Sequence, residues 1–399
     1  MKQRIVLVAL VCFCTTGATL AQEFRIFDRR VQVHGFGSQG FVYTNDNNWL
    51  TMNTSQGSGA MTDMGLNMSS QITDKFRVGA QVYDRNLGQL EQYHPSLDWA
   101  VADYRFRPWL GLRGGKVKTI LGLYNDTQDL DFLHTFALLP QSVYSTDLRE
   151  STIAHEGGDL YGDVALKRRL GTLSYTAYAG QRRDSQYGGY PYLLQVHGIA
   201  LTSYGGLQYG GDLRWATPLN GLLVGASRLN EEITGRGTLT LGGTTGPYEE
   251  HSNTDWMNEF YGEYTAGKLK LSCEWRRYWR DQAIASGLFR AQTDVRGAYV
   301  SASYRVAKRF QFGSYYSRYT INEPLITFPG VFPSHGHIYD TAITGRFDVN
   351  RYVNFKIEQH FMAGYGVPGQ YPSGFYAAQN QAGLEPDTRA LVLKTSFRF

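Results

Sequence analysis

The sequence predicts an all-β protein, a transmembrane antiparallel up-and-down β-barrel of about sixteen strands. Three observations favour this class: a strictly alternating last segment, short and long connections that follow each other in turn, and an N-terminal export segment. In the last segment, 389–399, one parity carries apolar side chains to the end of the chain, whereas the other carries Lys394 and Arg398. Successive side chains of a strand point to opposite faces, so this segment has one apolar face and one wet face. The apolar parity comprises Leu391, Leu393, Thr395, Phe397 and Phe399.

The first 21 residues have the pattern of a cleaved signal peptide. Lys2 and Arg4 precede an apolar run over 5–14, and small residues near Ala21 provide a cleavage site. The run is too short to span a bilayer as a helix, which needs about 20 residues. We therefore expect a signal peptide over 1–21 and a single barrel domain over 22–399. Of the three cysteines only Cys273 remains after cleavage, which excludes an intramolecular disulfide.

Composition narrows the functional class. The chain has 39 Lys and Arg against 35 Asp and Glu, and removing Lys2 and Arg4 leaves 37 against 35, a net charge of +2. This balance argues against a nucleic-acid partner, which calls for a strong basic excess. The 45 glycines and 28 tyrosines suit a twisted sheet with many turns and aromatic girdles. The mean hydropathy of −0.35 does not exclude a barrel, because lumen and lipid positions alternate and cancel in any average.

Alternating patterns predict the individual strands. Thr62–Thr73, for example, places Met64, Leu66 and Met68 on one face, and Lys268–Arg280 places Leu271 and Trp275 on one face. A Gly114-Gly115 pair predicts a bulge. In chain order the predicted strands are Val31–Tyr43, Thr62–Thr73, Phe76–Arg85, Leu97–Phe106, Trp109–Lys118, Thr152–Lys167, Leu170–Arg183, Thr202–Ala216, Leu222–Leu229, Thr254–Tyr264, Lys268–Arg280, Asp294–Val306, Phe310–Thr320, Ile338–Val349, Tyr352–Tyr365 and Arg389–Phe399.

The connections between these strands alternate strictly in length. Short turns such as Asp74-Lys75 and Asn350-Arg351 are followed by long polar loops, among them 45–61, 184–201, 230–253 and 281–293. In a soluble sandwich or barrel, short and long connections are not expected to lie at opposite ends of the sheet. Outer-membrane barrels have short periplasmic turns and longer extracellular loops, so the pattern favours a barrel with both ends on the periplasmic side.

The signal peptide, the terminal Phe399, the long third loop and the strand-to-loop region 109–144 (WLGLRGGKVKT, ILGLYNDTQD and ALLPQSVY) together resemble the bacterial outer-membrane porin superfamily. The resemblance covers the whole mature chain. It implies a channel in the outer membrane of a Gram-negative bacterium for small hydrophilic solutes and ions, without a cofactor. It also implies a homotrimer surrounded by lipid and lipopolysaccharide. Periplasmic chaperones and the barrel assembly machinery would then recognise Phe397 and Phe399 as the closure and assembly signal.

The third loop, 119–151, is the candidate constriction. It is more apolar than the other loops, which predicts that it folds against the inner wall and presents Asp126, Asp129 and Asp131 to the pore. We expect opposing cations at Arg77, Arg105, Arg113 and Lys116, because facing charges create a transverse field. Further lumen-wall cations are Lys270, Arg276, Arg305 and Lys356. Two alternatives remain: the loop could pack on a neighbouring subunit, and any wet wall carries charges of both signs.

Three rival functions also remain. A barrel of this size could be selective for a sugar, a carboxylate or a phosphate rather than a general pore. An outer-membrane enzyme would need a nucleophile beside a histidine, for which Ser142 and His134 share a loop, although the chain lacks a G-x-S-x-G motif. The three aspartates of the third loop could bind calcium, but their spacing is not that of an EF-hand, and the histidines show no zinc spacing. We therefore predict no metal site and no catalytic residue. We also expect the channel to have a slight preference for anions.

Overall fold

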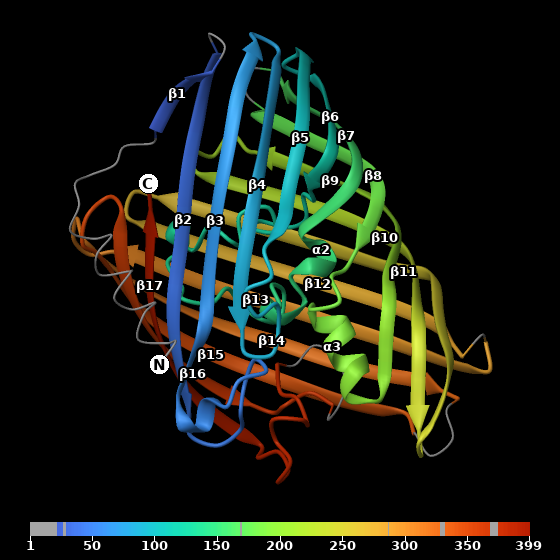
Figure 1. Ribbon diagram of the computed structural model, residues 1–399. Coiled ribbons are helices and arrows are strands. Elements are labelled where there is room, and N and C mark those ends of the chain that lie inside the picture. Colours follow the sequence, from blue (N-terminus) through green and yellow to red (C-terminus); the bar gives the residue numbers. More distant parts are fainter. Residues whose placement is uncertain (1–21, 27–28, 168–169, 286, 328–331, 368–373) are drawn as a thin grey trace.

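The computed structural model describes residues 22–26, 29–167, 170–285, 287–327, 332–367 and 374–399. The predicted signal peptide lies outside the described residues. Sixteen antiparallel strands form a closed barrel (Figure 1). They are β2 (Arg29–Thr44), β3 (Ser58–Thr73), β4 (Phe76–Leu87), β5 (Ser96–Arg107), β6 (Leu110–Lys118), β7 (Ala154–Ala165), β8 (Thr172–Arg183), β9 (Ile199–Ala216), β10 (Leu222–Leu241), β11 (Thr244–Ala266), β12 (Leu269–Ile284), β13 (Phe289–Arg305), β14 (Phe310–Ile326), β15 (Ser334–Asp348), β16 (Val353–Ala363) and β17 (Asp387–Arg398).

Each barrel strand pairs with its neighbours in the chain, and β17 pairs with β2 to close the ring, from Ala390↔Thr44 to Arg398↔Phe36. A further short strand, β1 (Gln22–Ile26), pairs with the beginning of β2, on the edge that β17 leaves free. The closed up-and-down arrangement predicted from the alternation is therefore confirmed. Closure matters energetically, because a sheet in lipid cannot leave an unpaired edge.

The closing contact has a distinctive shape, which we call the glycine–phenylalanine seam: Gly35 and Gly37 of β2 lie beneath the rings of Phe399 and Phe397. A Cβ atom added at Gly35 would lie 2.3 Å from the Phe399 ring, and one at Gly37 would lie 2.7 Å from the Phe397 ring. The backbone amide of Phe399 donates to the carbonyl of Gly35 at 2.9 Å. Aromatic rings that cover glycines in this way fix the position of one strand against the next.

The two faces of the sheet follow the predicted parity. The outer face carries half-exposed apolar side chains, such as Met68, Trp275 and Val300, whereas the alternate positions point into the lumen. This outer band is what the hydrocarbon core of a bilayer requires. No helix within the described ranges is long and apolar enough to cross a membrane.

The strands extend further than predicted on the side of the long connections. The predicted loop 230–253 is wrong: β10 and β11 continue as a ladder to Leu241↔Thr244, joined by a tight turn. Gly242 and Gly243 both have positive φ, +56° and +82°, as a two-residue hairpin turn requires. The predicted loop 281–293 is likewise mostly strand, from the ends of β12 and β13. Segments rich in Gly and Thr resemble loops in sequence, but cross-strand pairing keeps them extended.

Two smaller predictions also need correction. The sheet has no register shift at Gly114-Gly115; the irregularity between β5 and β6 lies instead between Arg105 and Arg107. The predicted loop 184–201 contains a helix, α3 (Gly189–Val196). This helix contributes buried Tyr190 and Leu193 to the interior. It packs beside β9, at the end of the barrel that carries the long loops (Figure 1).

Candidate functional site

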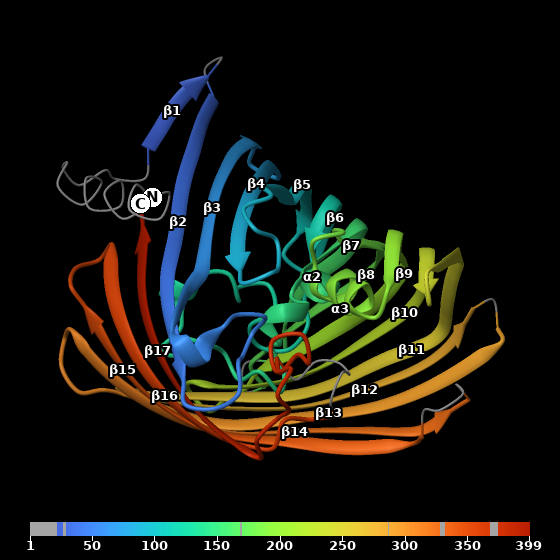
Figure 2. The ribbon, with the colours of Figure 1, turned by 60° about the horizontal axis from the view of Figure 1, so that its bottom comes forward.

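The third loop, between β6 and β7, lies inside the barrel (Figure 2). It contains three short helical turns, η2 (Asp131–Leu133), η3 (Thr146–Leu148) and α2 (Glu150–Ile153). Wall carboxylates accept hydrogen bonds from its backbone. The amides of Ala137 and Leu138 donate to Glu358 of β16 at 2.9 and 3.0 Å, and that of Leu123 donates to Glu274 of β12 at 2.9 Å. The loop is therefore held by charged groups that would otherwise be costly to bury.

Wall cations hold the carbonyl groups of the same loop. Lys356 of β16 donates to the carbonyl oxygens of Asp131 and Phe136 at 2.7 and 2.8 Å. Arg346 of β15 donates to those of Phe132 and His134, both at 2.8 Å. Anchors of both signs along the loop fix its path across the lumen, because they bind backbone groups that the loop does not pair within itself.

Two loop aspartates form buried ion pairs. Asp131 accepts from Lys356 at 2.9 Å and from Lys394 of β17 at 3.0 Å. Asp129 accepts from Arg149 at 2.7 Å and also pairs with Lys118. Burial alone would raise the pKa of Asp129, but Arg149 and Lys118 outweigh burial and hold that pKa well below its ordinary value. Both aspartates therefore remain charged and tie the loop to the wall.

A small cavity of the lumen, called here the narrow cavity, lies between this loop and β3, β4 and β17. Its volume is about 50 Å³, and it is lined by both loop aspartates and by Arg149 and Lys394. The Arg149 guanidinium stacks over the ring of Tyr83 at 4.1 Å. The acids and bases of this cavity are thus paired with one another, and the space beside them has room for only a few water molecules. The remaining charged residues that line it are Asp63 and Arg85.

Two larger luminal cavities lie on either side of the loop. One, of about 580 Å³, opens toward the long-loop end and is bounded by α3 and by β10 to β14. The other, of about 250 Å³, lies toward the short-turn end. The loop segment 139–144 separates them: Leu139 and Pro140 line the smaller cavity, and Gln141–Tyr144 line the larger one. The Ser142 hydroxyl donates to the carbonyl of Ala298 at 3.1 Å and attaches this partition to β13.

The four cations expected opposite the loop do not line the narrow cavity. Arg105 pairs with Asp163 at 2.7 Å, beside a short turn, and both side chains are about half exposed. Arg113 pairs with Asp159 at 3.3 Å, and Lys116 donates to the carbonyl of Leu97 at 2.7 Å. Arg77 stands opposite Asp103 in the ladder between β4 and β5. Arg105 and Arg113 therefore find acidic partners on a neighbouring strand of the wall instead of on the loop.

The predicted lumen-wall cations have different roles. Lys270 and Arg305 line the smaller cavity, and Arg276 lines the larger one. Lys356 is bound to the third loop. Among the predicted loop acids, Asp129 and Asp131 reach the narrow cavity, whereas Asp126 does not line it.

Sequence reasoning missed Arg149 and Lys118 as partners of the loop. Both lie at the roots of the third loop, and Arg149 also binds Asp98 of β5 at 2.5 Å. Their nearness to a loop with three aspartates was a usable signal. Lys394 lies on the wet parity of the last strand, but parity alone does not reveal that it reaches the loop.

The alternative sites find no support in the geometry. His134 donates to the carbonyl of Thr127 at 2.9 Å and Ser142 bonds to β13, so the two do not form a catalytic pair. Among the described residues no group of three His, Cys, Asp or Glu side chains could hold a metal ion. The carboxylates of Asp129 and Asp131 are instead occupied by cationic side chains.

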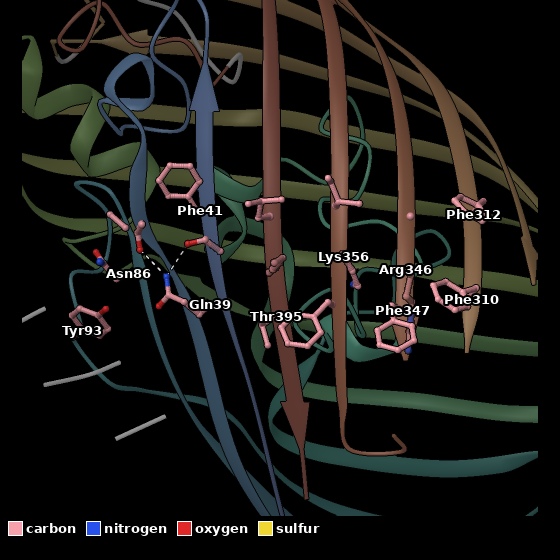
Figure 3. Close-up of a pocket in the computed structure, with 18 residues that line it drawn as sticks. Gln39, Phe41, Asn86, Tyr93, Phe310, Phe312, Arg346, Phe347, Lys356 and Thr395 are labelled. Atoms are coloured by element: carbon pink, nitrogen blue, oxygen red, sulfur yellow. Dashed lines mark hydrogen bonds between the residues drawn. The ribbon is translucent and has the colours of Figure 1, made fainter. Parts of the chain in front are cut away.

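A separate hollow of about 970 Å³ lies on the outer, apolar face, across β14 to β17 and β2. Figure 3 shows Phe310, Phe312 and Phe347 on one side of it and Gln39 and Asn86 on the other. Gln39 points outward, where it donates to the carbonyl of Gly59 at 2.8 Å. Although it is larger than the luminal cavities, this hollow is not part of the channel interior.

No family model and no curated protein matches this sequence. Solved structures do match its fold. OmpT, an outer membrane protein of Vibrio cholerae, shares 11% identity, with a TM-score of 0.58 over 95% of this chain and 100% of that one. A trimer form of OmpT gives 10% identity and a TM-score of 0.54, over 92% and 99%. The anion-selective porin from Comamonas acidovorans shares 11% identity, with a TM-score of 0.55 over 93% of this chain and 100% of that one. OmpF of Salmonella typhi, in complex with daunomycin, shares 12% identity, with a TM-score of 0.57 over 95% of this chain and 100% of that one. The chain therefore has the fold of the bacterial outer-membrane porins.

Proposed function

We propose that the chain forms a water-filled channel through which small hydrophilic solutes and ions diffuse across the outer membrane. The observation that carries this proposal is the charged third loop inside a barrel of sixteen strands. Barrels of this width leave an aqueous lumen, and a folded-in loop with facing acids and bases sets what passes. The short turns would face the periplasm and the long loops the exterior.

The direct test is ion conductance of the purified protein in planar bilayers. The channel proposal expects discrete conductance steps, and a salt gradient then gives the charge preference from the reversal potential. The smaller cavity is lined by Lys270, Arg305, Arg346 and Arg398 and by no acid. Lys270 pairs with Glu263, and Arg305 and Arg346 pair with Asp348, so this lining supports only a slight preference for anions. A protein that inserts as a folded barrel without conducting ions would refute the proposal.

A solute-selective channel is the second candidate. The ion pairs that fix the charged third loop across the lumen favour it, because such a loop narrows the passage and adds charged groups to its lining. Swelling of liposomes with neutral sugars of graded size separates the two candidates. A general pore discriminates by size alone, whereas a selective channel saturates with one class of solute.

We also propose that the chain assembles as a homotrimer, through the outer face that bears the hollow of Figure 3. Gln39 and Asn86 support this choice, because polar side chains on the outer face of a barrel are poorly solvated by lipid and better placed against protein. OmpT, a similar fold, is known in a trimer form. Light scattering of the detergent-solubilised protein tests the oligomeric state. The variant Gln39→Leu tests whether this outer face forms the interface between subunits.

A further inference from the structure

The larger luminal cavity has an unexpected wall. The inner positions of a porin-like barrel should be polar, yet Val295, Tyr319 and Ile321 line this cavity from β13 and β14. All three are buried. Met257 of β11 and Leu193 of α3 complete the apolar lining from the facing sides. Side chains from five neighbouring strands and from a helix in a loop therefore surround one apolar chamber at the long-loop entrance.

Four of the six charged groups that line this chamber pair with one another, and a fifth, Arg276, pairs with Glu259. Arg182 pairs with Glu231 at 3.0 Å, and Arg280 lies 3.6 Å from Glu250. Both guanidinium groups also stack on the ring of Tyr190, at 5.1 and 5.4 Å. Cations and acids that already satisfy each other offer little net attraction to a solute that carries an excess charge of either sign.

We propose that this chamber is a binding site for a small organic solute with an apolar body and an uncharged or zwitterionic polar head. The proposal rests on the channel function and names the solute class that the channel prefers. The volume of about 580 Å³ falls within the range of small-molecule sites, which are lined mainly by apolar and aromatic side chains with a few polar groups. Ordered water leaves such a wall when an apolar body covers it. A sugar or an inorganic ion has no apolar body and therefore gains no binding free energy from this release.

Free leucine and free asparagine are suitable probes, because they have the same number of heavy atoms and the same charges. We expect uptake of leucine into liposomes that contain the protein to exceed that of asparagine by at least about threefold, since partial burial of one isobutyl group is enough. Excess leucine should also reduce the ion current through the channel, whereas asparagine should not. This second measurement uses the unaltered protein and so does not depend on the folding of any variant.

Two matched double variants locate the effect. Val295→Thr with Ile321→Thr places hydroxyl groups on the chamber wall, whereas Ile338→Thr with Val392→Thr does so elsewhere in the same apolar cluster. The first should bring the ratio of leucine to asparagine uptake close to one, and the second should leave it unchanged. Equal uptake of both solutes by the conducting, unaltered channel overturns this inference alone. A complete absence of ion conductance overturns the channel function on which it rests.

Discussion

Replacing Asp131 by Asn should weaken the attachment of the third loop to β16 and β17 and widen the channel. The carboxylate of Asp131 is shared by Lys356 and Lys394, at 2.9 and 3.0 Å. The Lys356 side chain is fully buried and that of Lys394 is 7% exposed. An amide keeps the shape of the side chain but removes the charge that both ammonium groups face.

The cost can be bounded from the geometry. Removing one partner of a buried ion pair costs about 3–5 kcal/mol, because the remaining charge is left uncompensated. Lys394 retains Asp63 at 3.6 Å, so most of the loss falls on Lys356, and we expect the lower end of this range. A loss of about 3 kcal/mol weakens this attachment without abolishing it, because Arg346, Lys356 and Glu358 still hold six hydrogen bonds to the loop backbone, and each contributes about 1 kcal/mol.

The assay is single-channel recording with a salt gradient. Asp131→Asn should raise the conductance, add current fluctuations and shift the reversal potential toward anion selectivity, because two lysines lose their acid. Asp126→Asn is the matched control, from the same loop but outside the narrow cavity. Adding Lys356→Met to Asp131→Asn should recover part of the lost stability. Wild-type conductance and selectivity in Asp131→Asn would refute the assignment of this ion pair as the anchor.

Three further predictions concern pH, the wall and closure. Burial lowers the pKa of His134 from 6.5 to about 4, so the folded loop keeps this ring neutral. The stability that the neutral His134 ring contributes to the folded protein should be complete above pH 6.5 and should fall by up to about 3 kcal/mol as the pH drops toward 4. The variant His134→Gln retains a donor for the carbonyl of Thr127, and its thermal unfolding should depend less on pH. Arg113→Ala should change conductance little, since Arg113 pairs with Asp159 on the wall; a large change in single-channel current would contradict this placement. Deleting Phe399 should lower the amount of barrel in the outer membrane more than the conductance of each channel, and normal levels on blots of membrane fractions would count against it.

The fold was predictable from the sequence because it depends on a local pattern. Alternation in segments such as 62–73 and 389–399 directly records which side of the wall each residue faces. The extended hairpin of β10 and β11 was not predictable in this way. Beyond the bilayer neither face must be apolar, so the alternation fades, and only pairing in three dimensions keeps the chain extended.

The site was predictable only in part, for a related reason. The inward fold of the third loop followed from its apolar content, and Asp129 and Asp131 were singled out as its acids. The partners of Asp131, Lys356 and Lys394, lie more than two hundred residues further along the chain. Nothing in the local sequence distinguishes these two lysines from other inward-facing cations such as Arg113. The path of the loop across the lumen determines which cations it contacts.

The glycine–phenylalanine seam has a consequence for the size of the barrel. A slip of β17 by one pair of residues in either direction would place a ring over the side chain of Val33 or Gln39 instead of over a glycine. Only one stagger therefore lets both rings lie flat against β2. In a closed barrel the stagger and the number of strands together determine the diameter. Gly35 and Gly37 therefore help to set the diameter of the barrel, although neither lines one of the luminal cavities described above.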